Sequence, residues 1–259
     1  MKLIISTILF VTLIISVKAQ DLDLYKSEKF VRGTDTLLYR ILMPEDFDPA
    51  KTYPVMLFLH GAGERGSDNQ AQLTHGGKLF LQPDVRANHQ VIVIFPQCPA
   101  DSYWSNVNST TVNGKRNFEF EKGGKPTIAM EMLMGLMEEV KDRPYTDKER
   151  FYVGGLSMGG MGTFEILRRM RGDFAAAFAI CGGDNPKNVN KYKRVPLWIF
   201  HGAKDDVVAP ENSQIVVDAL KDKGADVRFT LYPEANHNSW DNAFAEPELL
   251  NWLFSHRKK

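Results

Sequence analysis

Seven short apolar runs recur along the chain, and helical patterns lie between or after several of them. Many of these runs are apolar without alternation, as expected of parallel strands that are buried on both faces. Strands that alternate with helices predict an α/β fold, with a mostly parallel central sheet and helices on both of its faces. The runs are "LLYRILM" (37–43), "PVMLFLH" (54–60), "VIVIFPQ" (91–97), "RFYVGGL" (150–156), "AAAFAICG" (175–182), "PLWIFHG" (196–202) and "VRFTLYP" (227–233).

Three stretches have the apolar spacing of amphipathic helices. We interpret the methionines of the first stretch, "IAMEMLMGLMEEV", as core residues rather than as a cofactor site. The stripes are Ala129, Leu133, Leu136, Met137 and Val140; Ile215, Val216, Ala219 and Leu220; and Leu249, Leu250, Leu253 and Phe254. The chain has no internal repeat, low-complexity tract or interdomain linker, so we expect residues 20–259 to form a single domain.

Polar residues and glycines gather where the predicted strands end. The segments are "HGAGERG", "PQCPADSYW", "LSMGG", "CGGDN", "HGAKDD" and "EANHNSW". Parallel sheets place their working residues at the carboxyl ends of the strands. We therefore expect these segments to meet at one edge of the sheet and to build a functional site there.

The stretch "FYVGGLSMGGMGTFEIL" (151–167) holds a serine between glycines, where a strand pattern changes to a helical one. Gly155 and Gly159 flank Ser157 in the pattern Gly-x-Ser-x-Gly, and glycine tolerates the crowding and the unusual dihedral angles of a very tight turn. This geometry is typical of a nucleophile elbow, so we predict that Ser157 is a catalytic nucleophile. The alternative is an ordinary turn in which Ser157 only caps the helix.

A serine nucleophile needs a base, and the base needs an acid that orients it. We predict His237 in "YPEANHNSW" as the base, because it follows the last predicted strand. Asp205 in "FHGAKDDVVAP" is the predicted acid, with Asp206 as its nearest rival and Asp184 as a third candidate. The chain order Ser157, Asp205, His237 is the serine–acid–histidine order of α/β-hydrolases.

An oxyanion hole needs backbone N–H donors near the carbonyl oxygen that becomes negative. Met158, directly after the serine, is one predicted donor, and Ala62 in the glycine-rich loop "HGAGERG" is the other. A phosphate-binding loop is the competing interpretation, but the lysine–serine or lysine–threonine ending of such a loop is absent. The sequence contains no visible cluster of metal ligands, so we expect neither a metal nor another cofactor.

The sequence resembles the α/β-hydrolase superfamily over essentially all of residues 20–259. The motifs "LFLHGAGERGSDN", "PQCP…YW", "GLSMGG", "HGAKDDVV" and "HNSW" carry the resemblance. They are similar to those of secreted bacterial esterases related to the prolyl-oligopeptidase, dienelactone hydrolase and polyhydroxybutyrate depolymerase/feruloyl esterase groups, including a group often labelled predicted peptidases. In that pattern the acid lies three residues after a His-Gly pair, which favours Asp205 over Asp206.

The resemblance implies a serine hydrolase that cleaves carboxylic esters through an acyl-enzyme intermediate. One alternative is a serine peptidase or amidase, because the same triad cleaves amides. Another is a non-catalytic member of the fold that binds a glycan or a peptide, since fold alone does not determine function. The sequence holds no long propeller domain, which argues against a prolyl-oligopeptidase-like peptidase.

The substrate class is predicted from what surrounds the serine. Residues 184–194, just before the strand that leads to the acid, are too few for a helical cap domain. We therefore expect open access to Ser157, with one wall from residues 100–125, where Trp104 presents an aromatic face. Trp240 is a second candidate for substrate binding, and core packing is the alternative for both tryptophans. An open, aromatic-walled cleft suits short-chain acyl or feruloyl-type esters of a bulky alcohol, such as a polysaccharide, better than long-chain lipids.

The N-terminus, "MKLIISTILFVTLIISVKAQ", has a basic start, a long apolar run and small residues before Gln20. This pattern predicts a cleaved signal peptide at residues 1–19 and a secreted or periplasmic protein without stable membrane insertion; the alternative is a retained anchor. Removal of Lys2 and Lys18 leaves 30 of the 32 basic residues against 32 acidic ones, a net charge near −2. This balance argues against nucleic acid or an anionic membrane surface as a main partner.

The two cysteines, Cys98 and Cys181, each follow a predicted strand. In the expected strand order these strands lie three positions apart, which is roughly 14 Å at the usual spacing of strands. A disulfide cannot span that distance without a long excursion of a loop. We therefore predict that the cysteines are not bonded to each other.

Overall fold

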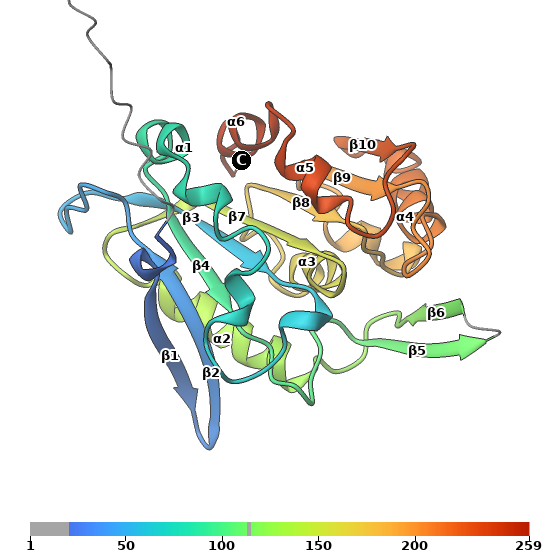
Figure 1. The fold of residues 1–259 in the computed structure, drawn as a ribbon, viewed down its shortest axis with the longest axis horizontal. Coiled ribbons are helices and arrows are strands. Elements are labelled where there is room, and N and C mark those ends of the chain that lie inside the picture. The colour runs from blue at the N-terminus through green and yellow to red at the C-terminus, as the bar shows by residue number, and fades with distance from the viewer. Residues whose placement is uncertain (1–20, 113–114, 259) are drawn as a thin grey trace, which may run out of the picture.

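The computed structural model describes residues 21–112 and 115–258, so the predicted signal peptide lies outside the described residues. An eight-stranded sheet with the order β1-β2-β4-β3-β7-β8-β9-β10 forms the centre of this part, and a two-stranded hairpin, β5-β6, stands apart from it (Figure 1). The strands are β1 Lys26–Arg32, β2 Asp35–Leu42, β3 Tyr53–Leu59, β4 Ile92–Pro96, β5 Val107–Val112, β6 Lys115–Phe120, β7 Thr146–Leu156, β8 Ala176–Ile180, β9 Leu197–Gly202 and β10 Val227–Tyr232.

The sheet is mostly parallel, as predicted, and each of the seven predicted strands is present. The six strands from β4 to β10 in the sheet order pair in parallel. The first two strands are antiparallel, with β2 paired to β1 on one side and to β4 on the other. Every residue of β3, β4, β8 and β9 is buried, which explains why their sequences are apolar without alternation.

Three strands have no counterpart in the sequence prediction. β1, with the sequence "KSEKFVR", lies at an edge of the sheet, and only Phe30 in it is partly buried. The hairpin strands β5 and β6 form their own two-stranded sheet, and most of their described side chains are exposed. Because these strands bury one face or less, their sequences lack the apolar run that identifies the other strands.

Helices cover both faces of the sheet, and the three predicted stripes lie in α2, α4 and α6. One hydrophobic cluster packs α2, α3 and α4 against the sheet, through residues such as Leu133, Phe164 and Val216. A second cluster packs α1 and α6 against the opposite face, through residues such as Val85 and Leu253. The helices are α1 Pro83–Asn88, α2 Ile128–Lys141, α3 Met158–Arg169, α4 Glu211–Lys221, α5 Trp240–Phe244 and α6 Leu249–Phe254 (Figure 1).

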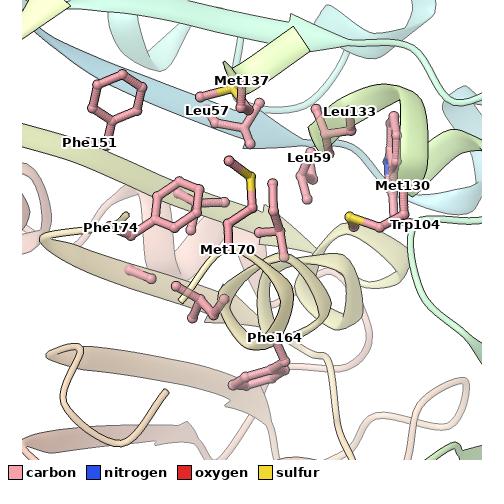
Figure 2. Close-up of a cluster of buried hydrophobic side chains, with 14 of the residues drawn as sticks. Leu57, Leu59, Trp104, Met130, Leu133, Met137, Phe151, Phe164, Met170 and Phe174 are labelled. Carbon is pink, nitrogen blue, oxygen red and sulfur yellow. The ribbon is translucent and has the colours of Figure 1, made fainter. Parts of the chain in front are cut away.

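Trp104 belongs to the first hydrophobic cluster, so the prediction that it forms a wall of the substrate cleft is wrong. Its side chain is 0% exposed and lies among core residues that include Met130 and Leu133 (Figure 2). A Cβ placed on Gly162 of α3 would lie only 2.5 Å from the Cβ of Trp104, which shows how tightly the tryptophan packs on this helix. The physical reason is that a large aromatic ring beside the sheet is stabilised more by burial than by exposure to water.

The region above the carboxyl ends of the strands carries no helical cap among the described residues between β8 and β9. This interval contains only a short 3₁₀ helix, η5 (Pro186–Lys191), which packs on α3 and α4. Asn185 and Asn188 donate side-chain hydrogen bonds to the backbone at Phe120 and Glu121, and thereby hold the base of the β5-β6 hairpin. The hairpin base therefore lies near the end of β8.

Two further findings concern the cysteines and the membrane. Cys98 and Cys181 are both buried and free, which confirms the prediction that they do not form a disulfide. Their strands, β4 and β8, lie three positions apart in the sheet. Within residues 21–112 and 115–258, the structure contains no helix that is long and apolar enough to cross a membrane.

Candidate active site

Ser157 occupies a sharp turn between β7, which ends at Leu156, and α3, which begins at Met158. Its backbone has φ 52° and ψ −116°, a conformation that residues other than glycine rarely adopt. The amide of Ser157 donates a hydrogen bond to the carbonyl oxygen of Ile180 at 2.9 Å. The turn is therefore a strained strand-to-helix elbow that is held by the neighbouring strand β8.

The glycines on either side of the serine make this elbow possible. A Cβ on Gly155 would lie 2.4 Å from the carbonyl oxygen of Gly159. A Cβ on Gly159 would lie 1.9 Å from the carbonyl oxygen of Leu59, at the end of β3. The crowding that the Gly-x-Ser-x-Gly pattern predicts is therefore present, and the contacting atoms belong to the backbone.

His237 joins Ser157 to Asp205 through two hydrogen bonds. The hydroxyl of Ser157 lies 3.0 Å from Nε2 of His237, and Nδ1 of His237 lies 2.8 Å from Oδ2 of Asp205. Because a carboxylate only accepts, Nδ1 carries the proton and Nε2 is free to accept from the serine. The His237 side chain is 19% exposed and the carboxylate of Asp205 is fully buried. The structure thus brings the predicted nucleophile, base and acid together in one hydrogen-bonded chain.

The carboxylate of Asp205 is held by four donors. Oδ1 accepts from the amides of Val207 and Val208, both at 2.9 Å. Oδ2 faces Nε2 of His201 at 3.2 Å as well as His237. Burial alone would raise the pKa of Asp205, but the hydrogen bonds from His201, His237 and Val208 lower it well below its usual range. The acid is therefore ionised wherever the protein is folded near neutral pH.

The two rival acids, Asp206 and Asp184, have hydrogen-bond partners other than His237. Asp206 is exposed, and its described hydrogen bond is a backbone one, from its amide to Oδ1 of Asn236. Asp184 is buried and accepts hydrogen bonds from Asn188 and Tyr192. Its burial raises the pKa of Asp184 to about 6. Neither carboxylate is hydrogen-bonded to His237 in the part of the chain that the structure describes.

The predicted oxyanion donors both border Ser157. Met158 is the first residue of α3, and Ala62 is the first residue of a short 3₁₀ helix, η2 (Ala62–Glu64). The first amides of a helix have no acceptor within that helix, so both remain available to a ligand. A Cβ placed on Gly61 would lie 3.8 Å from the Cβ of Ser157, which places the loop of Ala62 beside the serine. Their role as donors stays a prediction.

The side chain of His60 holds this loop in place through two hydrogen bonds. Its Nε2 accepts a hydrogen bond from the amide of Cys98 at 2.9 Å, so Nδ1 carries the proton and donates to the carbonyl oxygen of Gly61 at 2.6 Å. Burial lowers the pKa of His60 to about 4, so the ring is neutral near pH 7. The histidine therefore ties the loop after β3 to the loop after β4, as a structural residue.

Trp240, the second predicted substrate-binding residue, lies beside the site. Its ring packs edge-on against the ring of His237, with 5.4 Å between the centroids. Its other neighbour is His75, whose ring centroid lies 5.0 Å away. Trp240 is only partly buried, in contrast to Trp104. Its place therefore fits the predicted role, which stays a prediction.

One group of possible metal ligands includes two of these residues. The ligand atoms of Cys181, Asp205 and His237 lie within 4.8 Å of one another. However, burial raises the pKa of the Cys181 thiol, which disfavours the thiolate that a metal needs. The hydrogen bond between Asp205 and His237 accounts for the proximity of these two, so the donor set does not fit a metal well.

Sequence reasoning missed two residues of the site. His201, at the end of β9, is a second imidazole that faces Asp205, and the sequence analysis assigns it no role. Glu64 lies in the loop of Ala62, and its side chain is only 13% exposed. The first could have been found from its spacing, because His201 stands four residues before the acid. No pattern in the sequence predicts the direction of the Glu64 side chain.

The class of protein that this fold and the order of these three residues define is the α/β-hydrolase superfamily. A solved structure of a thermostable esterase superposes with a TM-score of 0.82 and 32% identity, covering 92% of this chain and 64% of that one. The model of the dienelactone hydrolase family matches residues 100–248, which is more than half of the chain. The chain belongs to the dienelactone hydrolase family.

Two relatives carry names that point to different classes of hydrolase. The chain is 26% identical over 221 residues to lysophospholipase-like protein 1 of Mus musculus, covering 77% of this chain and 85% of that protein. It is also 26% identical over 261 residues to dipeptidyl-peptidase 5 of Schizosaccharomyces pombe, covering 84% of this chain. The chain spans only 35% of the length of that peptidase. Because the names of the two relatives point to different bonds, the comparisons support hydrolysis without defining the bond that is cleaved.

Proposed function

We propose that the protein is a serine hydrolase that cleaves carboxylic esters through an acyl-enzyme intermediate. One observation carries the proposal. Ser157 lies at a strained elbow, its hydroxyl is hydrogen-bonded to His237, and His237 is hydrogen-bonded to the buried Asp205. A serine hydroxyl is a poor nucleophile until a base takes its proton, and this arrangement supplies the base and its orienting acid.

In the proposed reaction, Oγ of Ser157 attacks the ester carbonyl carbon while Nε2 of His237 takes the hydroxyl proton. The amides of Met158 and Ala62 stabilise the negative oxygen of the tetrahedral intermediate. The carbon–oxygen bond to the alcohol then breaks, and His237 returns the proton to the departing alcohol. Water repeats the sequence on the acyl-enzyme, which releases the acid and restores the serine. Asp205 stays ionised throughout and stabilises the protonated histidine.

We propose short-chain acyl or feruloyl-type esters of a bulky alcohol, such as a polysaccharide, as substrates. The interval between β8 and β9 holds only η5, which is too short to enclose a long acyl chain. The partly buried ring of Trp240 lies beside His237. A second partly buried ring, Phe120 of β6, stacks on Phe118. The ring of Phe120 lies close to Gly183, just after β8, and replaces Trp104 as the aromatic candidate in residues 100–125.

A serine peptidase is the second candidate function, and the similarity to dipeptidyl-peptidase 5 over 84% of the chain favours it. The test is a panel of acetyl, butyryl, feruloyl and palmitoyl esters together with peptide substrates, measured on the purified protein and on Ser157→Ala. We expect acetyl to butyryl or feruloyl esters to be cleaved faster than palmitoyl esters and peptides. Peptide cleavage faster than that of any ester would establish the second candidate instead.

A further inference from the structure

A cavity of about 570 Å³ lies at the end of α3 that is remote from Ser157. Its walls come from the loop between β6 and α2, from α2 itself, from the end of α3 and from η5. Ser157 directly precedes α3, whereas Arg168 and Arg169 lie in its last turn, so about 16 Å of helix separates the serine from these arginines. The cavity is therefore distinct from the proposed active site.

The cavity is lined by cations. Among its described lining residues four are basic and none is acidic, and the four are Arg168, Arg169, Arg171 and Lys191. The whole chain carries 32 basic and 32 acidic residues, so this concentration of positive charge is a local feature. A concave site lined by charges of one sign raises the local concentration of ions of the opposite sign.

Two buried carboxylates lie behind the cationic wall and balance only part of its charge. Glu165 is 1% exposed and accepts hydrogen bonds from both Arg168 and Arg169, so one carboxylate serves two guanidinium groups. Asp184 is the other buried carboxylate that interacts with Arg168 and with Lys191. Four cations against two carboxylates leave the cavity positively charged.

Arg171 and Lys191 are the two cations whose described hydrogen bonds go to neutral oxygens. Arg171 is exposed and donates to the backbone carbonyl oxygen of Arg168, and the partly buried Lys191 donates to the side chain of Asn188. Burial lowers the pKa of the Lys191 ammonium, and the guanidinium groups of the three neighbouring arginines lower it further. A bound anion would relieve this repulsion between like charges.

The loop on the opposite side of the cavity holds the cations in place. Gly123 and Gly124 follow β6 with φ 94° and 76°, and their carbonyl oxygens accept hydrogen bonds from Arg168 and Arg169, respectively. A Cβ placed on Gly123 would lie 3.8 Å from Nζ of Lys191. The positive groups are therefore largely fixed before any ligand binds, which lowers the entropic cost of binding.

We propose that this cavity binds an anion that carries two or more oxyanion groups, such as carboxylates or phosphates. The planar fork of a guanidinium group matches the geometry of both kinds of group. A volume of about 570 Å³ lies in the range of sites that hold small-molecule ligands. This inference goes beyond the proposed ester hydrolysis and does not depend on it.

The experiment measures binding by isothermal titration calorimetry at pH 7 and at a low ionic strength of about 20 mM, where charges are weakly screened. The multivalent probes are inorganic pyrophosphate and trigalacturonate. Galacturonate, with one carboxylate, and the neutral maltotriose are the comparison ligands. The unaltered protein is compared with Arg171→Gln/Lys191→Gln, and the matched control is Lys26→Gln/Lys29→Gln, which removes two exposed positive charges from β1.

We expect at least one multivalent probe to bind the unaltered protein more tightly than galacturonate does, and maltotriose not to bind. Arg171→Gln/Lys191→Gln should weaken that binding by about tenfold or more, because charge-assisted hydrogen bonds are lost. The control should stay within about twofold, since its charges are remote and screened. Tighter binding of pyrophosphate would identify phosphate groups as the ligand, and tighter binding of trigalacturonate would identify carboxylates on a sugar chain.

The absence of binding by both multivalent probes would overturn the inference, and so would equal losses of affinity in the two double variants. Thermal unfolding checks that the variants are folded, and Lys191→Gln alone repeats the test if the double variant does not fold. Hydrolysis of p-nitrophenyl acetate should be unchanged in both double variants, because the replaced residues lie away from Ser157. A protein that binds the probes but cleaves no ester would leave this inference standing and refute the proposed function.

Discussion

Replacing Asp205 by asparagine tests the geometry of the proposed triad more finely than removing the serine. Oδ1 accepts from the amides of Val207 and Val208 at 2.9 Å each, so the amide oxygen of the new asparagine must take this place. Its NH₂ group then falls at the position of Oδ2, which faces Nδ1 of His237 at 2.8 Å. Two donors cannot share one hydrogen bond, so the imidazole must place its proton on Nε2 instead.

The magnitude follows from this change of tautomer. With its proton on Nε2, His237 cannot accept the hydroxyl proton of Ser157, which lies 3.0 Å away. The loss of negative charge also destabilises the protonated histidine that forms during the reaction. The corresponding change in a serine protease lowers kcat by about 10⁴, so we expect about 5 kcal/mol of lost transition-state stabilisation for Asp205→Asn.

The assay is kcat/KM for p-nitrophenyl acetate at pH 8, with Asp206→Asn as the matched control on the adjacent residue. Circular dichroism and thermal unfolding establish that both variants are folded. We expect Asp206→Asn to retain activity within a few fold, because Asp206 is exposed. Equal losses in the two variants, or a larger loss in Asp206→Asn, would refute the assignment of the acid.

Three further predictions concern stability. Trp104→Ala should lower the free energy of unfolding by about 3–5 kcal/mol, because it empties a core site, whereas Trp240→Ala should mainly raise KM; chemical denaturation and kinetics of both variants check this. Gly159→Ala should abolish soluble folded protein, since its Cβ would lie 1.9 Å from a backbone oxygen, whereas Gly63→Ala, with nothing within 4 Å of its Cβ, should fold; equal yields would contradict the account of the elbow. Burial raises the pKa of Asp184 to about 6 from an unfolded value near 4, so its contribution to stability is fully present below about pH 4 and is lost as the pH rises through 6. Relative to the unaltered protein, Asp184→Asn should therefore gain about 3 kcal/mol between pH 4 and pH 8 in urea unfolding, and a parallel pH dependence of the two proteins would exclude this effect.

The sequence was most informative where one physical requirement dominated. Buried parallel strands must be apolar on both faces, so β3, β4, β8 and β9 could be predicted from their continuous apolar runs. The elbow at Ser157 could also be predicted from the sequence, because only glycine fits between the backbone atoms that surround positions 155 and 159. The positions of His237 and Asp205 followed from the rule that loops at the carboxyl ends of parallel strands meet.

The misses share a different cause, which is that side-chain direction depends on tertiary packing. Trp104 lies in a polar, aromatic segment whose sequence fits a surface loop, yet the ring turns into the core beside α3. Glu64 looks like an ordinary loop carboxylate, but the close approach of Gly61 to Ser157 brings it to the site. The edge strand β1 is polar because solvent contacts most of its residues, so no pattern separates it from a loop.

Covalent labelling is the most direct test of whether Ser157 is an activated nucleophile. The purified protein is treated with a fluorophosphonate probe, and the labelled peptide is located by mass spectrometry, with Ser157→Ala and His237→Ala in parallel. We expect one probe per molecule on Ser157, no labelling of Ser157→Ala and strongly slowed labelling of His237→Ala. Labelling of another residue, or no labelling of a folded protein that hydrolyses esters, would contradict this expectation.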